Sequence, residues 1–246
     1  MIRLLWLGIG LSMWQISAIA IDSPVFPNPY AVGIALVESF QSGVLFEAIG
    51  ASLARVAIGY SMAALLGISL GIFLSLGPKI GRPLQTVLEV LRPIPPIAWV
   101  PLAILWFGIG NQAAWFIVFI GAFFPIFIQV YVAFLRPPTH FMELAIQYRL
   151  PSSDVFWSIR LPSAAQEICQ ALRVGLGLAW TSVIAAELVG VRSGLGDRIG
   201  QLRYALDYEG VIGCMLCIGV LGWLMAVLAL KLEQRFIPWI RYTSED

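Results

Sequence analysis

The sequence predicts an all-α integral membrane protein with six transmembrane helices. Hydrophobic residues make up 59% of the chain and charged residues only 12%, whereas about a quarter of the residues of a soluble domain are charged. The mean hydropathy of +0.87 agrees, and the apolar residues fall in runs near the length of about 20 residues that crosses a bilayer. The 246 residues leave room for five or six such runs and for no soluble domain. The net charge of +1 gives no indication of nucleic-acid binding.

The first apolar run covers residues 2–21. It holds about 18 apolar residues, which is longer than most signal-peptide cores and favours an uncleaved span. The alternative is a signal peptide that is cleaved after the triplet Ala18-Ile19-Ala20. We assign residues 1–30 to a first transmembrane helix with a periplasmic linker, and residues 31–246 to the main transmembrane domain.

The linker and the helix after it begin the main domain. Three prolines within residues 22–29 exclude a regular helix there. Residues 31–45 then read as a short interfacial helix with Glu38 and Gln41 on its polar side, or as the beginning of the next span.

The second span covers residues 50–76 and carries two small residues, Gly67 and Gly71, whose spacing lets another helix approach closely. Arg55 lies near its beginning, and its long side chain is expected to reach the membrane surface. The triplets Gly77-Pro78-Lys79 and Gly81-Arg82-Pro83 are both expected to break the helix.

The segment 84–109 is unusual because four prolines, from Pro93 to Pro101, interrupt one hydrophobic run. A continuous helix is not expected from Arg92 to Pro96. Broken backbone at membrane depth is tolerated where it is buried in protein or lines a cavity, which would place this segment near a solute pathway. The alternative is a pair of helices that meet at the membrane surface, with Arg92 among the headgroups.

Three further spans follow, at residues 113–135, 171–191 and 210–230, and an amphipathic helix at 197–208 precedes the last of them. Polar and ionisable side chains within a span often face the bundle interior and mark a solute route. The alternative for the charged ones is a position near the membrane surface. The candidates in these spans are Gln129, Arg173, Trp180 and Glu187.

Catalysis by this chain has little support in the sequence. No phosphate-binding loop of the form Gly-x-x-x-x-Gly-Lys-Ser/Thr and no His-Glu-x-x-His motif is present. The only histidine, His140, follows two prolines outside the spans and is expected at the surface, where alone it builds no metal site. Cys214 and Cys217 could indicate redox or metal chemistry, but their apolar helical context favours packing, as for Cys169. We therefore predict no catalytic and no metal-binding residue.

The distribution of positive charge predicts the orientation. With both termini and the loop that contains Glu143 in the cytoplasm, nine cationic residues lie inside and three lie outside, as the positive-inside rule requires. The inside group is Arg3, Lys79, Arg82, Arg136, Arg149, Arg160, Lys231, Arg235 and Arg241, and the outside group is Arg192, Arg198 and Arg203.

The loop at 136–163 contains the stretch ELAIQYRLPSSDVFWSIRLP, residues 143–162. Its charges exclude a span, yet it also carries apolar side chains that need a surface to cover them. One interpretation is an amphipathic loop that lies on the membrane. The other is a docking element whose short helix fits a groove on a soluble partner.

The same stretch resembles a cytoplasmic motif of permease subunits of bacterial ABC importers: Glu-Ala-Ala, three residues, Gly, nine residues, Ile-x-Leu-Pro. Here the spacing is kept, with Leu144 in place of the first Ala and Arg149 in place of the Gly. Glycine allows a left-handed turn that arginine adopts only at a cost. Further similarity to the sulfonate, taurine and nitrate branch lies in Leu91 to Gly110, Gly121 to Gln129, Ser52 to Gly59, Ala185 to Gly190 and Leu232 to Trp239.

This resemblance implies a type I importer fold, similar to the methionine permease. It also implies a second copy of the chain, cytoplasmic subunits that bind ATP and Mg²⁺, an extracytoplasmic solute-binding protein, and the bacterial inner membrane as location. No cofactor is expected in this chain. The solute would be a small anion such as nitrate, a sulfonate or taurine, although the branch also handles uncharged and cationic vitamins and their precursors.

The resemblance also implies which residues act. A coupling helix from Glu143 to Trp157 would dock the ATPase, with contributions from Glu143, Ala145, Arg149, Phe156, Trp157 and Pro162. Candidates for the translocation pathway are Arg92, Pro96, Gln129, Arg173, Trp180 and Glu187. Two hypotheses compete with the importer permease: a membrane enzyme, and a channel or assembly subunit without ATP coupling.

Overall fold

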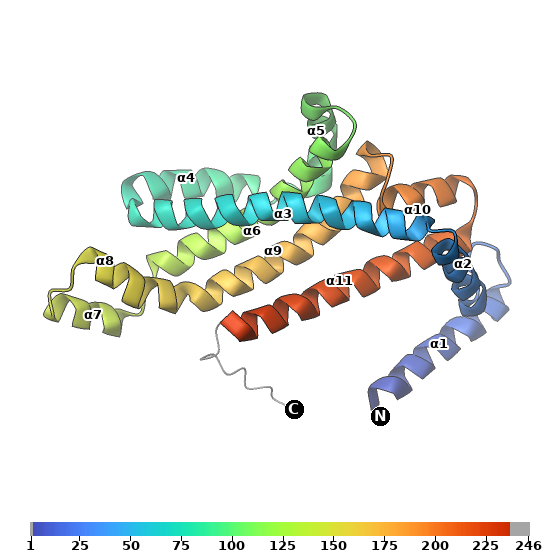
Figure 1. Cartoon of the computed structure of the whole chain (residues 1–246), viewed down its shortest axis with the longest axis horizontal. Helices are drawn as coiled ribbons and strands as arrows, with labels where there is room; N and C mark the ends of the chain where they lie inside the picture. Colours follow the sequence, from blue (N-terminus) through green and yellow to red (C-terminus); the bar gives the residue numbers. More distant parts are fainter. Residues whose placement is uncertain (1, 237–246) are drawn as a thin grey trace.

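The structure is a computed structural model that describes residues 2–236, in which long helices run beside one another (Figure 1). The segment 237–246, including Pro238, Trp239 and Arg241, lies outside the described residues. The elements are α1 (Ile2–Ile21), α2 (Pro29–Gln41), α3 (Val44–Leu76), α4 (Pro78–Leu91), the 3₁₀ turn η1 (Pro96–Trp99), α5 (Val100–Phe107), α6 (Asn111–Leu135), α7 (Thr139–Gln147), α8 (Ser152–Val155), the π-turn η2 (Phe156–Arg160), α9 (Leu161–Gly190), α10 (Leu195–Tyr204) and α11 (Tyr208–Phe236).

Four helices are long and apolar enough to cross a membrane: α3, α6, the continuous helix 152–190 that joins α8 to α9, and α11. The bent pair α4 and α5 gives a fifth if it counts as one span. In α1 the stretch that qualifies as apolar, Gly8–Ile21, is shorter. The predicted helical membrane class is confirmed, and the number six stays a prediction.

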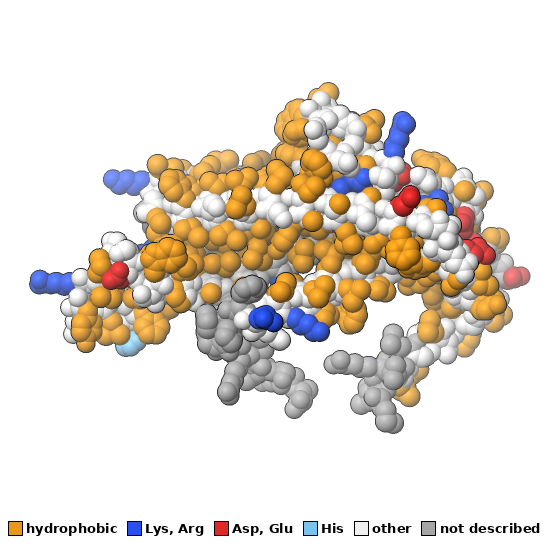
Figure 2. All heavy atoms as spheres, viewed as in Figure 1, with side chains coloured by type: hydrophobic (Ala, Val, Ile, Leu, Met, Phe, Trp, Pro, Cys, Tyr) orange, Lys and Arg blue, Asp and Glu red, His pale blue; other side chains and the backbone are white. Residues whose placement is uncertain are grey.

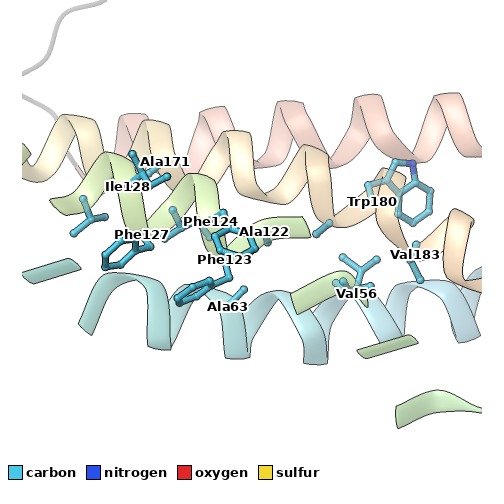
Figure 3. Close-up of a cluster of buried hydrophobic side chains, with 14 of the residues drawn as sticks. Val56, Ala63, Ala122, Phe123, Phe124, Phe127, Ile128, Ala171, Trp180 and Val183 are labelled. Carbon is cyan, nitrogen blue, oxygen red and sulfur yellow. The ribbon is translucent and has the colours of Figure 1, made fainter. Parts of the chain in front are cut away.

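The core lies between α3, α6 and α9, with α6 at its centre. Of the most apolar stretch of each helix, 67% is buried in α6, compared with 28% in α3 and 17% in α11. The rings of Phe123, Phe127 and Tyr131 stack in succession along α6, with centroids 5.8 Å apart. Figure 3 shows the first two of these rings between the flanking helices. α6 is therefore shielded on most sides, and α11 presents most of its surface outward.

Glycines bring α3 and α6 together. A Cβ atom added at Gly67 would lie 2.9 Å from Cγ2 of Ile126, and one added at Gly71 would lie 2.9 Å from Cγ1 of Val130. Real Cβ atoms do not approach so closely, so only glycine fits there at this helix separation. The close approach predicted for Gly67 and Gly71 is confirmed, and the neighbour is α6.

The linker is held where it enters α2, at Pro27 and Asn28. Trp14 of α1 donates its Nε1–H to the carbonyl of Pro27 at 3.1 Å. Asn28 then caps α2, because its Oδ1 accepts the backbone N–H of Ala31 at 2.9 Å. α2 ends before the predicted boundary at residue 45, because Gly43 takes a φ of 76° and starts α3 in a new direction.

α4 follows α3 directly and runs back beside it (Figure 1). The helix continues through residues 81–83, so the break predicted at Gly81-Arg82-Pro83 is wrong. Pro83 removes one hydrogen bond from the helix without ending it. Gly81 lies where a side chain would clash with the carbonyl oxygen of Leu74, so this glycine permits the tight turn between the two helices.

The break predicted between Arg92 and Pro96 is present, because α4 ends at Leu91 and the two halves of the pair meet at 91°. α4 begins at the end of the bundle that carries α7 and α8 (Figure 1). After α5, the N–H of Gly110 donates to the carbonyl of Gly190 at 3.0 Å, at the opposite end. The break therefore lies between the two ends, which favours a position at membrane depth.

The amphipathic helix predicted at 197–208 is observed as α10, which begins at Leu195 and ends at Tyr204. Leu206 takes a φ of 59°, and the N–H of Asp207 donates to the carbonyl of Leu202 at 3.0 Å, which closes the helix. Asp207 in turn caps α11 by accepting the N–H of Gly210 at 2.8 Å. Leu206, which lies beyond the end of α10, is 67% exposed.

Most of the visible face of the molecule is hydrophobic, and its acidic side chains lie toward the two ends (Figure 2). Large apolar side chains on α3, α4 and α11 remain exposed, among them Leu65, Phe73, Val90 and Trp223. A surface of this kind is stable only in contact with lipid or with other apolar protein.

The glycine contacts give a test in which two like substitutions have opposite effects. Gly59→Ala would place a Cβ atom 2.7 Å from Val118 and 2.8 Å from the carbonyl oxygen of Trp115, whereas nothing lies within 4 Å of a Cβ atom at Gly50 of the same helix. We expect Gly59→Ala to destabilise the fold by about 1–3 kcal/mol and Gly50→Ala to stabilise it by up to about 1 kcal/mol. Thermal unfolding in detergent measures both. Equal melting temperatures for the two variants would contradict the packing described.

Candidate functional site

The loop between α6 and α9 is a helical hairpin, residues 139–160, at one end of the molecule (Figure 1). Its first arm is α7 and its second arm is α8 with η2. The segment Glu143 to Trp157, expected as one coupling helix, is thus two arms joined by a turn. The second arm continues into α9 without interruption, so residues 152–190 form one helical rod.

Arg149 forms the turn of the hairpin in the left-handed conformation, with a φ of 54°. Its N–H donates to the carbonyl of Ile146 at 3.1 Å, and the N–H of Leu150 donates to the carbonyl of Ala145 at 2.9 Å. These two bonds are the pattern in which helices end at a glycine. Arginine therefore takes the conformation expected of the glycine in the motif, at a cost of about 1–2 kcal/mol.

The predicted coupling residues of the hairpin fall into two groups, one that faces the bundle and one that is exposed. Ala145 is buried, and Phe156 stacks on Phe134 of α6 with ring centroids 5.9 Å apart, so both face the bundle. Glu143 is exposed, and Trp157 is 66% exposed while its ring meets the edge of Phe156. Pro162 lies in the first turn of α9.

The outward face of the hairpin is more apolar than the predicted set suggests. Ile146 and Tyr148 are 73% and 74% exposed, and Phe141 and Leu150 are exposed too. Several large apolar side chains exposed on one short element are typical of a protein-docking surface.

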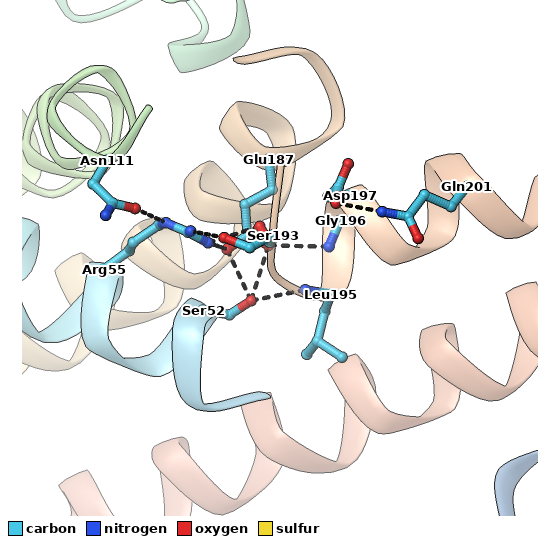
Figure 4. A network of polar contacts seen from close by, with 9 residues as sticks. All are labelled: Ser52, Arg55, Asn111, Glu187, Ser193, Leu195, Gly196, Asp197 and Gln201. Carbon is cyan, nitrogen blue, oxygen red and sulfur yellow. Dashed lines mark hydrogen bonds and ion pairs between the residues drawn. The ribbon is translucent and has the colours of Figure 1, made fainter. Parts of the chain in front are cut away.

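At the end of α9 that lies opposite the hairpin, Arg55 and Glu187 form a buried ion pair (Figure 4). Nη1 lies 2.6 Å from Oε1, and the two side chains are 4% and 0% exposed. Arg55 also donates its Nε–H to Oδ1 of Asn111 at 2.8 Å, and it donates to the carbonyl and hydroxyl of Ser193. The expectation that Arg55 reaches the membrane surface is wrong, because a carboxylate on α9 holds it inside.

Glu187 is the common acceptor of this network. The hydroxyl of Ser52 lies 2.8 and 2.9 Å from its two oxygens, and the N–H of Gly196 donates to Oε2 at 3.0 Å. Ser52 in turn accepts the N–H of Leu195 at 2.9 Å. The segments Ser52 to Gly59 and Ala185 to Gly190 thus meet here. Sequence reasoning missed this contact, although Arg55 is the only cation of α3 and Glu187 is one of only two acids in α9. The role of Glu187 in a pathway stays a prediction.

Two other predicted pathway residues, Arg173 and Trp180, lie between α9 and α11. Nη1 of Arg173 is 3.2 Å from Oε2 of Glu233, and Nε1–H of Trp180 donates to the carbonyl of Ile218 at 3.0 Å. Arg173 also lines two neighbouring cavities of about 350 and 240 Å³, the second of which includes Trp180.

The remaining pathway candidates lie apart from these. Gln129 of α6 lines a cavity of about 390 Å³ near the base of the hairpin. Arg92 is exposed at the break between α4 and η1, and Pro96 is half-buried at the beginning of η1. The structure therefore does not gather the six candidates into one site within this chain.

Within residues 2–236, no group of three or more His, Cys, Asp or Glu side chains could hold a metal ion. The three cysteines are free, and Cys214 lies buried in the core.

Known proteins resemble the chain over most of its length. Residues 63–242 match the family described as "Binding-protein-dependent transport system inner membrane component". The taurine transport system permease protein of Escherichia coli K12 is 29% identical over 92% of this chain and 84% of its own length. The nitrate import permease protein of Synechocystis is 30% identical over 94% and 87%. A structure of the MetNI methionine ABC transporter in an inward-facing conformation superposes with a TM-score of 0.68 at 20% identity, over 78% of this chain and 95% of that one, which shows a shared fold.

A double-mutant cycle tests the buried ion pair. Glu187→Leu or Arg55→Met alone leaves one buried charge without its partner, and we expect each to destabilise the chain by about 3–5 kcal/mol. The double variant removes both charges and is expected to recover most of that loss. Thermal unfolding and membrane yield measure the effect, with the exposed Glu38→Leu as control. Additive losses in the double variant would show that the two side chains act independently.

The turn of the hairpin gives a second test. Arg149→Gly removes the cost of the left-handed conformation and is expected to stabilise the hairpin by about 1 kcal/mol. Tyr148→Gly one residue earlier, where the backbone is right-handed, is expected to destabilise it. Hydrogen exchange at residues 145–151 reports both changes. Slower exchange after Tyr148→Gly than after Arg149→Gly would refute the assigned turn.

Proposed function

Because the chain belongs to the family of binding-protein-dependent transport system inner membrane components, and is a permease subunit of an ABC importer, we propose that it imports a small anion such as nitrate, a sulfonate or taurine. ATP hydrolysis in a separate cytoplasmic subunit drives the transport. The observation that carries this proposal is the hairpin. It lies at one end of the continuous helix 152–190 and presents exposed apolar side chains.

The hairpin is the docking site for the ATP-binding subunit. Ile146, Tyr148 and Trp157 supply exposed apolar area, and Glu143 supplies a charge beside them. Aromatic side chains of this kind are enriched where proteins bind each other. Phe156 has a different part, because its stacking on Phe134 fixes the hairpin to α6. The hairpin therefore moves with the spans rather than independently of them.

The continuous rod 152–190 transmits the motion. A displacement of the hairpin by the ATP-binding subunit becomes a displacement of α9, because no loop separates them. At the other end of α9, Glu187 passes the motion to α3 through Arg55 and to the beginning of α10 through Gly196. A rigid-body movement of this kind switches the access of the spans between the two membrane faces.

The remaining parts of the assembly follow from this arrangement. The hairpin and both termini lie in the cytoplasm, as the charge distribution favours. The end that carries α10 then faces outward and receives a solute-binding protein, and a second copy of the chain covers part of the exposed apolar surface. Gln129, Arg173, Trp180, Arg92, Pro96 and Glu187 remain the candidates for the pathway.

Glu143→Lys tests the docking role. The substituted side chain is exposed, so we expect the chain to reach the membrane in normal amount. Reversal of the charge is expected to weaken docking by about 1.4 kcal/mol or more, which is tenfold in affinity. Co-purification of the ATP-binding subunit and ATP-driven uptake into vesicles measure the effect. The matched control is Glu38→Lys, an exposed glutamate on α2. Normal uptake by the Glu143 variant would exclude this role.

A further inference from the structure

A cavity whose mainly apolar wall carries several polar side chains lies where α6 ends, the hairpin begins and α9 starts. Its volume is about 390 Å³, and its polar lining comes from Gln129, Arg136, Ser163, Glu167 and Gln170. The two smaller cavities between α9 and α11 are lined by Arg173 as well, but there the guanidinium is paired with Glu233. The cavity touches both helices that hold the hairpin, so anything bound there contacts a span and the base of the hairpin together.

Two opposite charges in this lining have no protein partner. Among the ion pairs of residues 2–236, none involves Arg136 or Glu167. Arg136 closes the C-terminal end of α6, and Glu167 lies in the second turn of α9. Both side chains are exposed, so they are accessible to a ligand that enters the cavity. A ligand with one charge of each sign would be attracted by both side chains, whereas a simple anion would be repelled by the carboxylate.

An amide at the inner wall of the cavity also lacks a partner. Oε1 of Gln129 is buried and accepts no hydrogen bond in the structure. A buried polar atom without a partner is rare in proteins and costs free energy unless a ligand or water satisfies it. Because a glutamine amide can rotate, it can offer a carbonyl to an ammonium group or an N–H to an anionic oxygen.

We propose that this cavity is a binding site for a small zwitterion, in which Arg136 holds a sulfonate or carboxylate and Glu167 with Gln129 holds an ammonium group. The inference rests on the proposed function and deepens it, because it places a solute site at the cytoplasmic side of the bundle. It also narrows the solute class from anions in general to molecules such as ω-amino sulfonates or ω-amino acids. Nitrate carries no cationic group that could pair with Glu167.

Two pairs of probes test the proposal. Taurine and ethanesulfonate share a sulfonate on a two-carbon chain and differ by the ammonium group, and β-alanine and propionate are the corresponding carboxylates. Each is titrated calorimetrically into the chain in lipid nanodiscs, together with any ATP-binding subunit that accompanies it. We expect each zwitterion to bind at least about tenfold more tightly than its partner, because a charged hydrogen bond is lost without the ammonium group.

Variants separate the contributions of the two charges. Glu167→Gln is expected to abolish the preference for the zwitterions over their partners, because it removes the carboxylate that holds the ammonium group and repels the simple anions. Arg136→Gln is expected to weaken all four probes. Glu38→Gln, an exposed glutamate on α2 far from the cavity, is the matched control and is expected to change none. Unchanged melting temperatures establish that the variants are folded.

The outcomes that overturn the proposal are distinct from those that overturn the proposed function. Equal affinity for a zwitterion and its partner, unaltered taurine binding by Glu167→Gln, or no binding of any probe would each refute the zwitterion site. Absence of the ATP-binding subunit from the purified chain would contradict the proposed function, while the titration would still decide on the cavity.

Discussion

The buried ion pair between Arg55 and Glu187 is the interaction on which the rest of the structure depends. Removing either partner would leave a charge inside the bundle at a cost of several kcal/mol, so α3 and α9 are held in one register. Asn111 attaches the first turn of α6 to the same guanidinium, and the N–H of Gly196 attaches the beginning of α10 to the same carboxylate. One pair of charges thereby fixes one end of four helices in a bundle whose exterior is apolar.

The other end of the bundle is held in a different way. There the hairpin is joined to α6 by ring stacking and to α9 by an unbroken helix, and neither contact involves a charge. Between the two ends, glycines of α3 let α6 approach so closely that the three core helices act as one body. The hairpin is therefore connected to the far end of α9 by one continuous helix.

Sequence reasoning could place the spans, because a bilayer requires about 20 apolar residues for each crossing, and it could place the hairpin from the spacing of its motif. It could not place the pairing of Arg55 with Glu187, because the two lie 132 residues apart and no local pattern selects one acid among many. It also misjudged the helix at Gly81, where absence of a side chain serves a close turn instead of a break. At Arg149, two backbone hydrogen bonds override the preference of arginine for right-handed backbone.

We expect the hairpin end of the bundle to bind the ATP-binding subunit and the α10 end not to bind it. Photo-cross-linking from two exposed tyrosine positions tests this most directly: Tyr148 on the hairpin and Tyr204 on α10, which are 74% and 81% exposed. A photoreactive phenylalanine analogue at each position preserves the aromatic ring, and mass spectrometry of native membranes identifies what is captured. We expect position 148 to capture an ATP-binding subunit and position 204 to capture a solute-binding protein or nothing. Capture of the ATP-binding subunit from position 204, or its absence at position 148 in membranes that transport the solute, would contradict the account.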